Sequence, residues 1–184
     1  MKPHVLSLFD FTGNWSRPWL ATHTVEQVDL KHGQNVLNYR TKRKVDVLLA
    51  APPCTVWARS GAWVQRSESE FLEAFATLAA VASIVRETQP RVWALENPAG
   101  FVERLIGKPQ FVFQPWEYGD DKSKRTCLWG KFTPPLPLLH GSGYLGQPSN
   151  AWLMKLGGKS DRTKEIRSAT PEGFALAFYR ANLS

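Results

Sequence analysis

Cysteine is scarce in this sequence, and long apolar runs are missing from it. The 184 residues include only Cys54 and Cys127, which are too few for a disulfide framework. Neither belongs to a CxxC pair and the four histidines are scattered, so we expect no structural zinc site. No apolar stretch approaches the roughly 20 residues of a membrane-spanning helix. The sequence therefore predicts a protein that needs neither a metal ion nor a membrane.

A secretory signal is also lacking. An apolar, strand-like run begins at residue 5, directly after a short polar start, so the expected compartment is the cytoplasm. Hydrophobic residues make up 43% and charged residues 21% of the chain, which excludes a disordered polypeptide. No internal repeat is visible. The length predicts one domain over residues 1–184.

Basic residues outnumber acidic ones. Lysine and arginine total 23 against 16 aspartate and glutamate residues, which gives a net charge of +7. This excess favours an anionic partner such as nucleic acid, although many soluble proteins are equally basic for other reasons. Eight tryptophans add aromatic faces that pack in cores or, in loops, stack on bases.

Apolar segments alternate between strand and helix character. We expect strands at 5–9, 24–29, 45–51 and 92–96, with helices near 17–18, at 69–88 and from 170 to about 182. Weaker strands are expected at 110–114 and 126–129, with an antiparallel orientation as one option, and surface loops at 131–158. Ser67 and Glu70 fit a capping box. The expected apolar face of the helix that follows comprises Phe71, Leu72, Phe75, Leu78, Ala79, Ala82 and Val85. This alternation predicts an α/β fold with a mainly parallel sheet.

Reactive side chains follow the expected strands where each strand ends. Asp10, Asp29, Cys54 and Glu96 all occupy such positions. Open parallel sheets bind ligands at the carboxyl ends of their strands. We therefore expect these side chains to share one edge of the sheet.

Cys54 and Glu96 can each be interpreted as a structural residue or as a catalytic residue. Cys54 follows two prolines after a buried strand, and is either a small buried hydrophobe or a nucleophile. Glu96 is either a capping or ion-pairing residue, or a desolvated carboxyl group whose raised pKa suits proton donation. Neither residue alone decides between its two readings.

Five motifs, in a consistent order along the chain, favour a catalytic role for Cys54 and Glu96. The runs SLFDFTGN at 7–14, APPCTVWARSG at 51–61, LENP at 95–98, KSKRT at 122–126 and RSATPE at 167–172 resemble motifs of the cytosine-5 DNA methyltransferases. The resemblance covers most of residues 5–172 and is strongest at 51–61 and 95–98. It implies a Rossmann-like fold that binds S-adenosylmethionine.

The resemblance also implies roles for single residues. Cys54 would add to carbon 6 of cytosine, Glu96 would hold and protonate N3, and Arg125 would contact O2 or the sugar-phosphate. The loop after Cys54 would close over a flipped-out base. Its substrate-binding residues would be Trp57, Arg59, Asn97 and Lys124.

The same resemblance implies a cofactor site at the ends of the first three strands. Its residues would be Phe9, Asp10, Gly13, Asn14, Asp29, Leu30, Asn35 and Pro53. Phe9 would pack on the adenine ring, and Asp29 would bind the ribose hydroxyls. The family has glycines where this chain has Phe11 and Asn14, so the first turn must be built differently.

The chain is short for this family. Residues 131–165 stand where the family carries a large target-recognition domain, so a second copy or an accessory subunit is a plausible partner, and a phage a plausible source. Two other readings stay open. One is the same carbon-5 chemistry on free cytosine nucleotides or with another one-carbon group. The other is an inactive relative that only binds DNA or a partner protein.

Overall fold

A computed structural model describes residues 2–58, 63–137 and 161–183 of the chain. The strands are β1 (His4–Leu8), β2 (Thr24–Val28), β3 (Val47–Ala50), β4 (Val92–Pro98), β5 (Phe111–Phe113) and β6 (Thr126–Lys131). The α-helices are α1 (Glu68–Thr88), α2 (Val102–Ile106), α4 (Asp161–Ser168) and α5 (Glu172–Asn182). Short 3-10 helices are η1 (Arg17–Ala21), η2 (Leu30–His32), η3 (Val36–Asn38) and η5 (Pro115–Tyr118).

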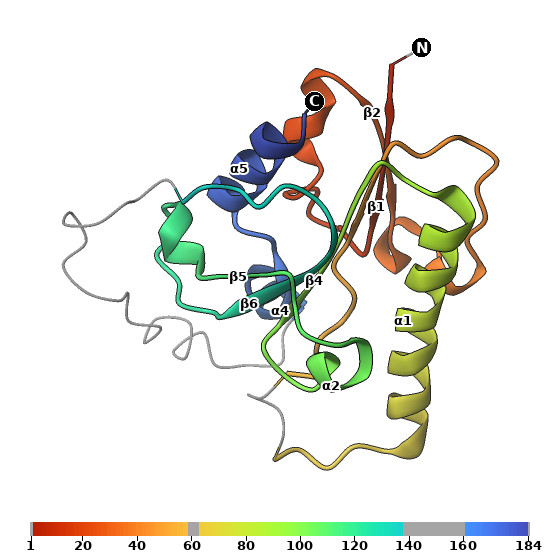
Figure 1. Ribbon diagram of the computed structural model, residues 1–184. Coiled ribbons are helices and arrows are strands. Elements are labelled where there is room, and N and C mark those ends of the chain that lie inside the picture. Colours follow the sequence, from red (N-terminus) through yellow and green to blue (C-terminus); the bar gives the residue numbers. More distant parts are fainter. Residues whose placement is uncertain (1, 59–62, 138–160, 184) are drawn as a thin grey trace.

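The strands of the described residues form one six-stranded mixed sheet in the order β2-β1-β3-β4-β6-β5. β1 to β4 run parallel, whereas β6 is antiparallel to both of its neighbours. Leu8 is level with Val28 and Ala50, and Ala50 is level with Leu95. The first four strands therefore end at a common carboxyl edge, which lies at the bottom of Figure 1. The expected α/β class and the antiparallel pair are confirmed.

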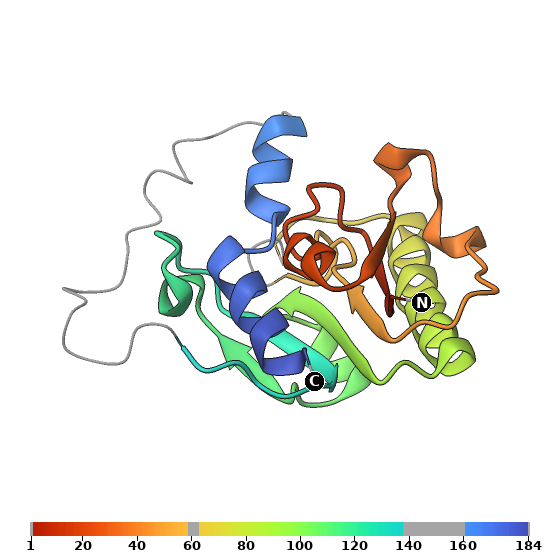
Figure 2. The same ribbon diagram turned by 90° about the horizontal axis from the view of Figure 1, so that it is seen from above.

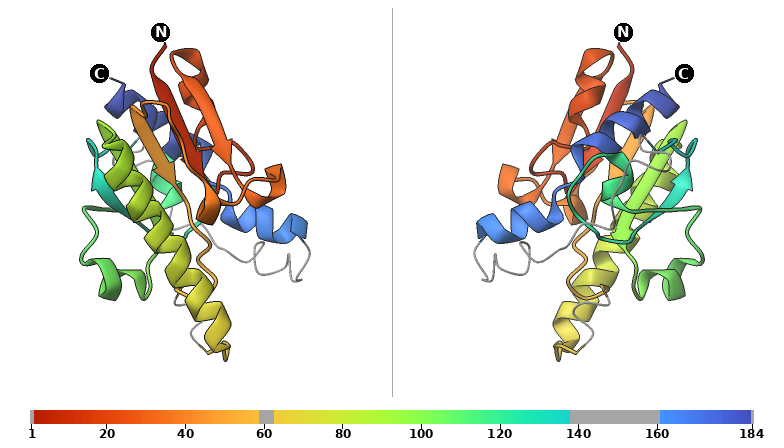
Figure 3. Two further views of the ribbon diagram at one scale, coloured as in Figure 1. Left: turned by 90° about the vertical axis from the view of Figure 1, so that its right-hand side faces the viewer. Right: turned by 90° about the vertical axis from the view of Figure 1, so that its left-hand side faces the viewer.

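Helices cover both faces of the sheet (Figures 2 and 3). On the α1 face, the strand residues of the core are Leu6, Leu8, Leu48, Ala50 and Leu95, and the helix contributes Leu78, Val81 and Ile84. On the α5 face, the strand residues are Val5, Val47, Leu49, Ala94 and Leu128, packed with Trp15, Trp19, Phe174 and Phe178. Because helices bury both faces of these strands, the side chains on both faces are apolar. The strand sequences are therefore continuous hydrophobic runs rather than alternating ones.

Helix α1 confirms its predicted capping box and part of its predicted apolar face, namely Leu78 and the partly buried Val85. The capping box between Ser67 and Glu70 is present. The buried residues are Thr77, Leu78, Val81 and Ile84, whereas Phe71, Leu72 and Phe75 are exposed. The reason is visible in Figure 3, where the first turns of α1 project beyond the carboxyl edge of the sheet. Apolar residues there have no strand to cover.

Three further elements differ from expectation. Helices α2 and α4 were not predicted, because each is short and neither carries a strong apolar period. Thr170 does not cap α5: Pro171 holds the N-cap position and no side chain bonds to the first turn. Of the surface loops expected at 131–158, residues 138–158 lie outside the described residues. No helix of the described residues is long and apolar enough to cross a bilayer.

Helix α5 is fixed to the sheet by aromatic stacking, which gives a test of the core. The rings of Phe113 and Phe174 lie 3.8 Å apart and nearly parallel. We expect Phe174→Ala to lower the free energy of unfolding by about 3–5 kcal/mol, since it leaves a cavity in a closed core. Leu176→Ala, on the exposed side of the same helix, should cost less than about 1 kcal/mol. Urea denaturation of both variants measures this, and equal losses would contradict the packing described.

Candidate active site

The connections of β1 and β3 create a topological switch point at the carboxyl edge. From β1 the chain passes to η1, whose Trp19 lies on the α5 face. From β3 it passes to α1, on the opposite face. Neighbouring strands whose connections leave to opposite sides mark the ligand-binding edge of an open α/β sheet. The residues that follow β1, β2, β3 and β4 all meet this edge.

Cys54 lies just beyond β3, at the start of a tight turn. Its carbonyl oxygen accepts hydrogen bonds from the backbone N–H groups of Trp57, at 3.0 Å, and Ala58, at 2.8 Å. The thiol is partly buried, and burial raises its pKa. The free protein therefore holds Cys54 as a thiol near neutral pH, placed at the sheet edge where a ligand would meet it.

Glu96 lies near the end of β4, one strand away from Cys54. Its side chain is only 8% exposed, and burial raises the pKa of its carboxyl group. Within the described part of the chain, no hydrogen bond is made to this carboxyl group. A buried carboxyl group is costly to ionise, so it retains its proton to higher pH than an exposed glutamate. Such a group is suited to donating a proton to a bound ligand.

Lys124 joins these two residues in one electrostatic cluster. Its positive charge lowers the pKa of Cys54 and of Glu96, against the larger effect of burial on each. The negative charge of Glu96 in turn raises the pKa of Cys54. The cluster therefore combines a nucleophile, an acid and a cation from three different segments of the chain.

Asn97 ties the end of β4 to the segment that carries Cys54. Its side chain is fully buried, and its Nδ2 donates to the carbonyl oxygen of Pro52 at 3.0 Å. Its Oδ1 is buried and has no hydrogen-bond partner among the described residues. The predicted substrate contact of Asn97 stays a prediction. The observed role of its amide is to position the two prolines before Cys54.

Trp57 is buried in this structure, and its predicted role against a flipped base stays a prediction. Its side chain is 4% exposed and belongs to the core on the α1 face. Its ring packs edge-on against Phe75 and Phe71, at centroid distances of 5.0 and 6.3 Å. The physical reason is that these two residues of α1 extend past the sheet and need an apolar partner. Arg59, the companion of Trp57 in that prediction, lies outside the described residues.

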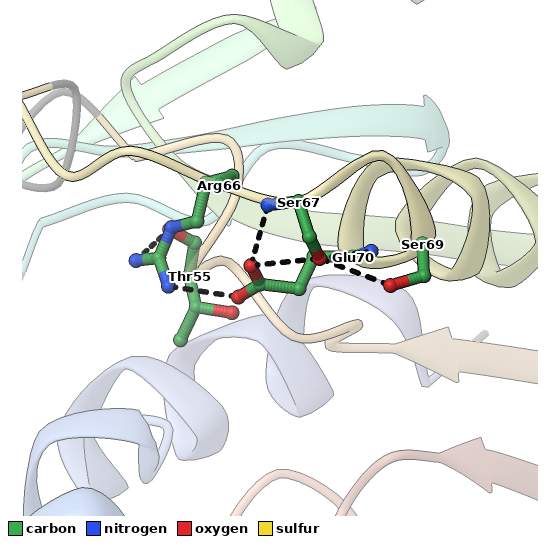
Figure 4. A network of polar contacts seen from close by, with 5 residues as sticks. All are labelled: Thr55, Arg66, Ser67, Ser69 and Glu70. Atoms are coloured by element: carbon green, nitrogen blue, oxygen red, sulfur yellow. Dashed lines mark hydrogen bonds and ion pairs between the residues drawn. The ribbon is translucent and has the colours of Figure 1, made fainter.

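The far end of the loop after Cys54 is held by a polar network in which Arg66 extends the predicted capping box of Ser67 and Glu70 (Figure 4). The guanidinium group of Arg66 donates to the carbonyl oxygen of Thr55 and to Oε1 of Glu70, both at 3.1 Å. Glu70 also accepts the backbone N–H of Ser67 at 2.8 Å as part of the capping box. Residues 55 and 66 are thereby brought together at the start of α1. The available signal was the i, i+4 spacing of Arg66 and Glu70.

Arg125 does not join the cluster of Cys54, Glu96 and Lys124. Its side chain is exposed, and its positive charge lowers the pKa of Cys127 rather than that of Cys54 or Glu96. Neighbouring residues of an extended segment point to opposite sides, which explains why Lys124 faces the pair and Arg125 does not. The substrate contact predicted for Arg125 is not tested by this arrangement.

The loop after β1 is held by its own side chains. Asp10 is buried, and its Oδ2 accepts hydrogen bonds from Oγ of Ser7 at 2.9 Å and from the N–H of Ser16 at 3.1 Å. Gly13 has a φ of +71°, and a Cβ there would lie 2.8 Å from Nε2 of Gln27. Asp10 and Gly13 thus shape the loop. Their predicted contact with a cofactor stays a prediction.

The bulky residues that replace glycines in this loop find partners outside it. The ring of Phe11 lies 5.2 Å from that of His32 and 4.6 Å from Nζ of Lys31. The amide of Asn14 donates to the carbonyl oxygen of Thr170 at 3.3 Å and accepts from Arg17 at 3.0 Å. Both side chains therefore contact neighbouring segments. These contacts explain how the loop accommodates Phe11 and Asn14 in place of the expected glycines.

The remaining predicted cofactor residues lie at the ends of β1 to β3. Phe9 has a φ of +60°, rare for a residue with a side chain, and its N–H donates to the carbonyl oxygen of Val28. Asp29 and Asn35 cap η2 and η3, each using one oxygen. Leu30 and Pro53 are exposed. The structure thus brings this set to one edge without deciding what it binds.

A cavity of about 610 Å³ lies beside this edge on the α5 side. Its lining consists of Asn14 together with residues 118–122 and 169–173. The segments 118–122 and 169–173 were not predicted to meet, because they are distant in sequence and carry no shared pattern. Glu172, one of the lining residues, forms an exposed salt bridge with Arg17 at 3.0 Å. Among the described residues, no group of histidine, cysteine or acidic side chains could hold a metal ion.

Comparisons with known proteins give little further information. No protein-family model and no curated protein matches the chain. Among solved structures, it is similar to a candidate DNA modification methyltransferase encoded within a prophage of E. coli, with 15% sequence identity and a TM-score of 0.49. The match covers 70% of this chain and 46% of that chain. A likeness at this level assigns neither a substrate nor a reaction to the present protein.

The cluster makes a prediction about the reactivity of Cys54. Because the charge of Lys124 lowers the pKa of Cys54, Lys124→Met should move the pH profile of Cys54 alkylation by iodoacetamide to higher pH. Arg125→Met is the matched control and should leave the profile in place. Both are measured in a Cys127→Ala background, so that only one thiol reacts. A shift caused by Arg125→Met and not by Lys124→Met would refute the assignment.

Proposed function

We propose that this protein is an S-adenosylmethionine-dependent methyltransferase that modifies carbon 5 of cytosine in DNA. The observation that carries the proposal is the cluster of Cys54, Glu96 and Lys124 at the carboxyl edge, beside the switch point between β1 and β3. A purely structural role explains a buried cysteine. It does not explain a buried carboxyl group beside it whose pKa is raised by burial and lowered in part by the charge of Lys124. The motifs at 51–61 and 95–98 support the same chemistry.

The roles of the cluster follow from the chemistry of cytosine, whose carbon 5 is a poor nucleophile. Sγ of Cys54, as the thiolate, forms a bond to carbon 6, and the electron pair of the 5,6 double bond moves to carbon 5. Glu96 donates its proton to N3 as negative charge develops on the ring. After methyl transfer, a base removes the carbon-5 proton, and the electron pair of that C–H bond restores the 5,6 double bond and expels the thiolate of Cys54. N3 returns its proton to Glu96, which regenerates the acid.

Lys124 and Asn97 support these two residues. The charge of Lys124 favours the thiolate of Cys54 when the thiol loses its proton, because it lowers the pKa of that group. The hydrogen bond of Asn97 to Pro52 fixes the backbone before Cys54 relative to Glu96 on the same strand as Asn97. The positions of nucleophile and acid therefore depend on one buried amide.

The residues at the ends of β1 and β2 fit S-adenosylmethionine. Asp29 uses one carboxylate oxygen to cap η2, which leaves the other for ribose hydroxyls. Leu30 is exposed beside it, and the ring of Phe9 packs partly against the core at the neighbouring strand end. When bound, this cofactor supplies the methyl group that carbon 5 receives. Phe11 points to His32 and Lys31 and so does not fill the edge.

DNA as the substrate is supported by the charge of the chain and by the motif order. The net charge of +7 favours a polyanion over a small neutral ligand. In a duplex the target base has to leave the stack before Sγ of Cys54 reaches carbon 6. The short segment 131–165 favours recognition with the help of a second copy or an accessory subunit.

A covalent trap tests the nucleophile. DNA that carries 5-fluorocytosine should form a stable adduct with the protein, because fluorine blocks the final loss of a proton from carbon 5. Cys54→Ala should abolish both the adduct and turnover, whereas Cys127→Ala should retain them. Mass spectrometry detects the adduct, and labelled cofactor measures turnover on DNA and on free nucleotides. Turnover by Cys54→Ala would exclude the proposed mechanism, and turnover on nucleotides alone would change the substrate.

Calorimetry with S-adenosylhomocysteine tests the cofactor site. Asp29→Ala should weaken binding by about 1–3 kcal/mol, the cost of leaving polar partners unmet. Asp29→Asn retains a cap for η2 and should still bind more weakly than the unaltered protein, since the carboxylate is the group required. Undetectable binding by the unaltered protein would favour an inactive relative.

A further inference from the structure

Helix α2 and its N-cap residue Phe101 together expose three large apolar side chains at the edge that carries the candidate active site. Phe101, Leu105 and Ile106 are 39%, 43% and 45% exposed, whereas Val102 is fully buried and anchors the helix. Figure 1 places α2 at the carboxyl edge of the sheet. The exposure of apolar side chains to water is unfavourable, and a cluster of them on the surface can mark a binding site.

The backbone connects this surface to the segment that carries Cys54. The N–H of Phe101 donates to the carbonyl oxygen of Trp57 at 2.8 Å, and Ala58 forms an antiparallel bridge with Gly100. A Cβ on Gly100 would lie 2.0 Å from the carbonyl oxygen of Trp57, so only glycine allows this approach. Phe101 therefore has a fixed position relative to the turn that starts at Cys54.

The charges around this surface are mainly positive. The guanidinium group of Arg104 lies 5.1 Å from the centre of the Phe101 ring. Lys108 follows α2, and the exposed Arg125 accepts the N–H of Ala99 through its carbonyl oxygen. Glu103 is the acidic residue of α2, and its charge acts on buried Cys127. An aromatic ring beneath a guanidinium group, with further cations nearby, suits a nucleobase and its phosphate.

We propose that α2 enters the DNA beside the target cytosine. Phe101, Leu105 and Ile106 form an apolar wedge that packs on the bases next to the vacated position, and Arg104 contacts the adjacent phosphate. Proteins that distort a duplex use apolar wedges of this kind, and the contact with the bases offsets the cost of unstacking. This inference rests on the proposed function, since it needs DNA as the substrate.

The size and charge of the surface favour DNA over a second protein chain. A stable protein interface buries roughly 800 Å² on each partner, which three side chains of a five-residue helix and its N-cap residue do not supply. A wedge needs only a few apolar atoms, provided that cations hold the backbone on either side. Self-association through α2 is therefore treated as an outcome of the test.

The test compares DNA substrates in which the target cytosine is paired, mismatched or single-stranded. Phe101→Ala should slow methyl transfer about 10- to 100-fold on the paired substrate, in keeping with the loss of one base stack. On the mismatched and single-stranded substrates, the rate should stay within about threefold of the unaltered protein, because the base is already free. Leu105→Ala should show the same pattern with a smaller loss. Leu20→Ala, which removes an exposed leucine of η1 away from this edge, is the matched control.

Each other outcome has a definite meaning. Equal losses on all three substrates, or no loss on paired DNA, would overturn the wedge while leaving the proposed function intact. Inactivity of the unaltered protein on every DNA would overturn the proposed function and the wedge with it. A dimer in sedimentation that Phe101→Ala dissociates would assign the surface to a second copy instead. Arg104→Gln should reduce the slope of log affinity against log salt by about 1, and an unchanged slope would remove Arg104 from the contact.

Discussion

The candidate site depends on the close approach of the chain after β3 to the chain after β4. Two contacts maintain it, the hydrogen bond from Asn97 to Pro52 and the backbone bridge between Ala58 and Gly100. Both lie within a few residues of the groups assigned to the chemistry. Parallel strands bring their ends to one edge, but they do not by themselves fix the loops that follow. These two contacts convert proximity at the edge into a defined position of Cys54 relative to Glu96.

Burial and charge act against each other in this cluster, and burial has the larger effect on both groups. It raises the pKa of Cys54 and of Glu96, whereas Lys124 lowers them. A resting thiol is protected from oxidation and alkylation, and a protonated carboxyl group is ready to donate. The cluster thus favours the neutral form of each group over a wider pH range than the same group has when it is exposed to solvent.

The sequence was informative wherever a local pattern sufficed. Buried strands such as 5–9 and 92–96 were predictable from continuous apolar runs, and the start of α1 was predictable from its capping box. Strand-end residues such as Cys54 and Glu96 were predictable because parallel sheets gather strand ends at one edge. These predictions use only short-range sequence information and one rule of topology.

The rest depended on tertiary contacts that no local pattern contains. The orientation of the extended segment before β6 determines whether Lys124 or Arg125 faces Glu96. A shift of one residue along this segment would exchange the two side chains. The burial of Trp57 depends on the overhang of α1, which depends on the length of the strands it covers. The role of Arg66 required two segments to meet around an unpredicted turn. Since β6 runs against β1 to β4, it delivers Lys124 to the site from the residue before a strand rather than after it. The connection between β5 and β6 therefore sets where Lys124 stands relative to Glu96, and its buried Tyr118 links that position to the packing of α5.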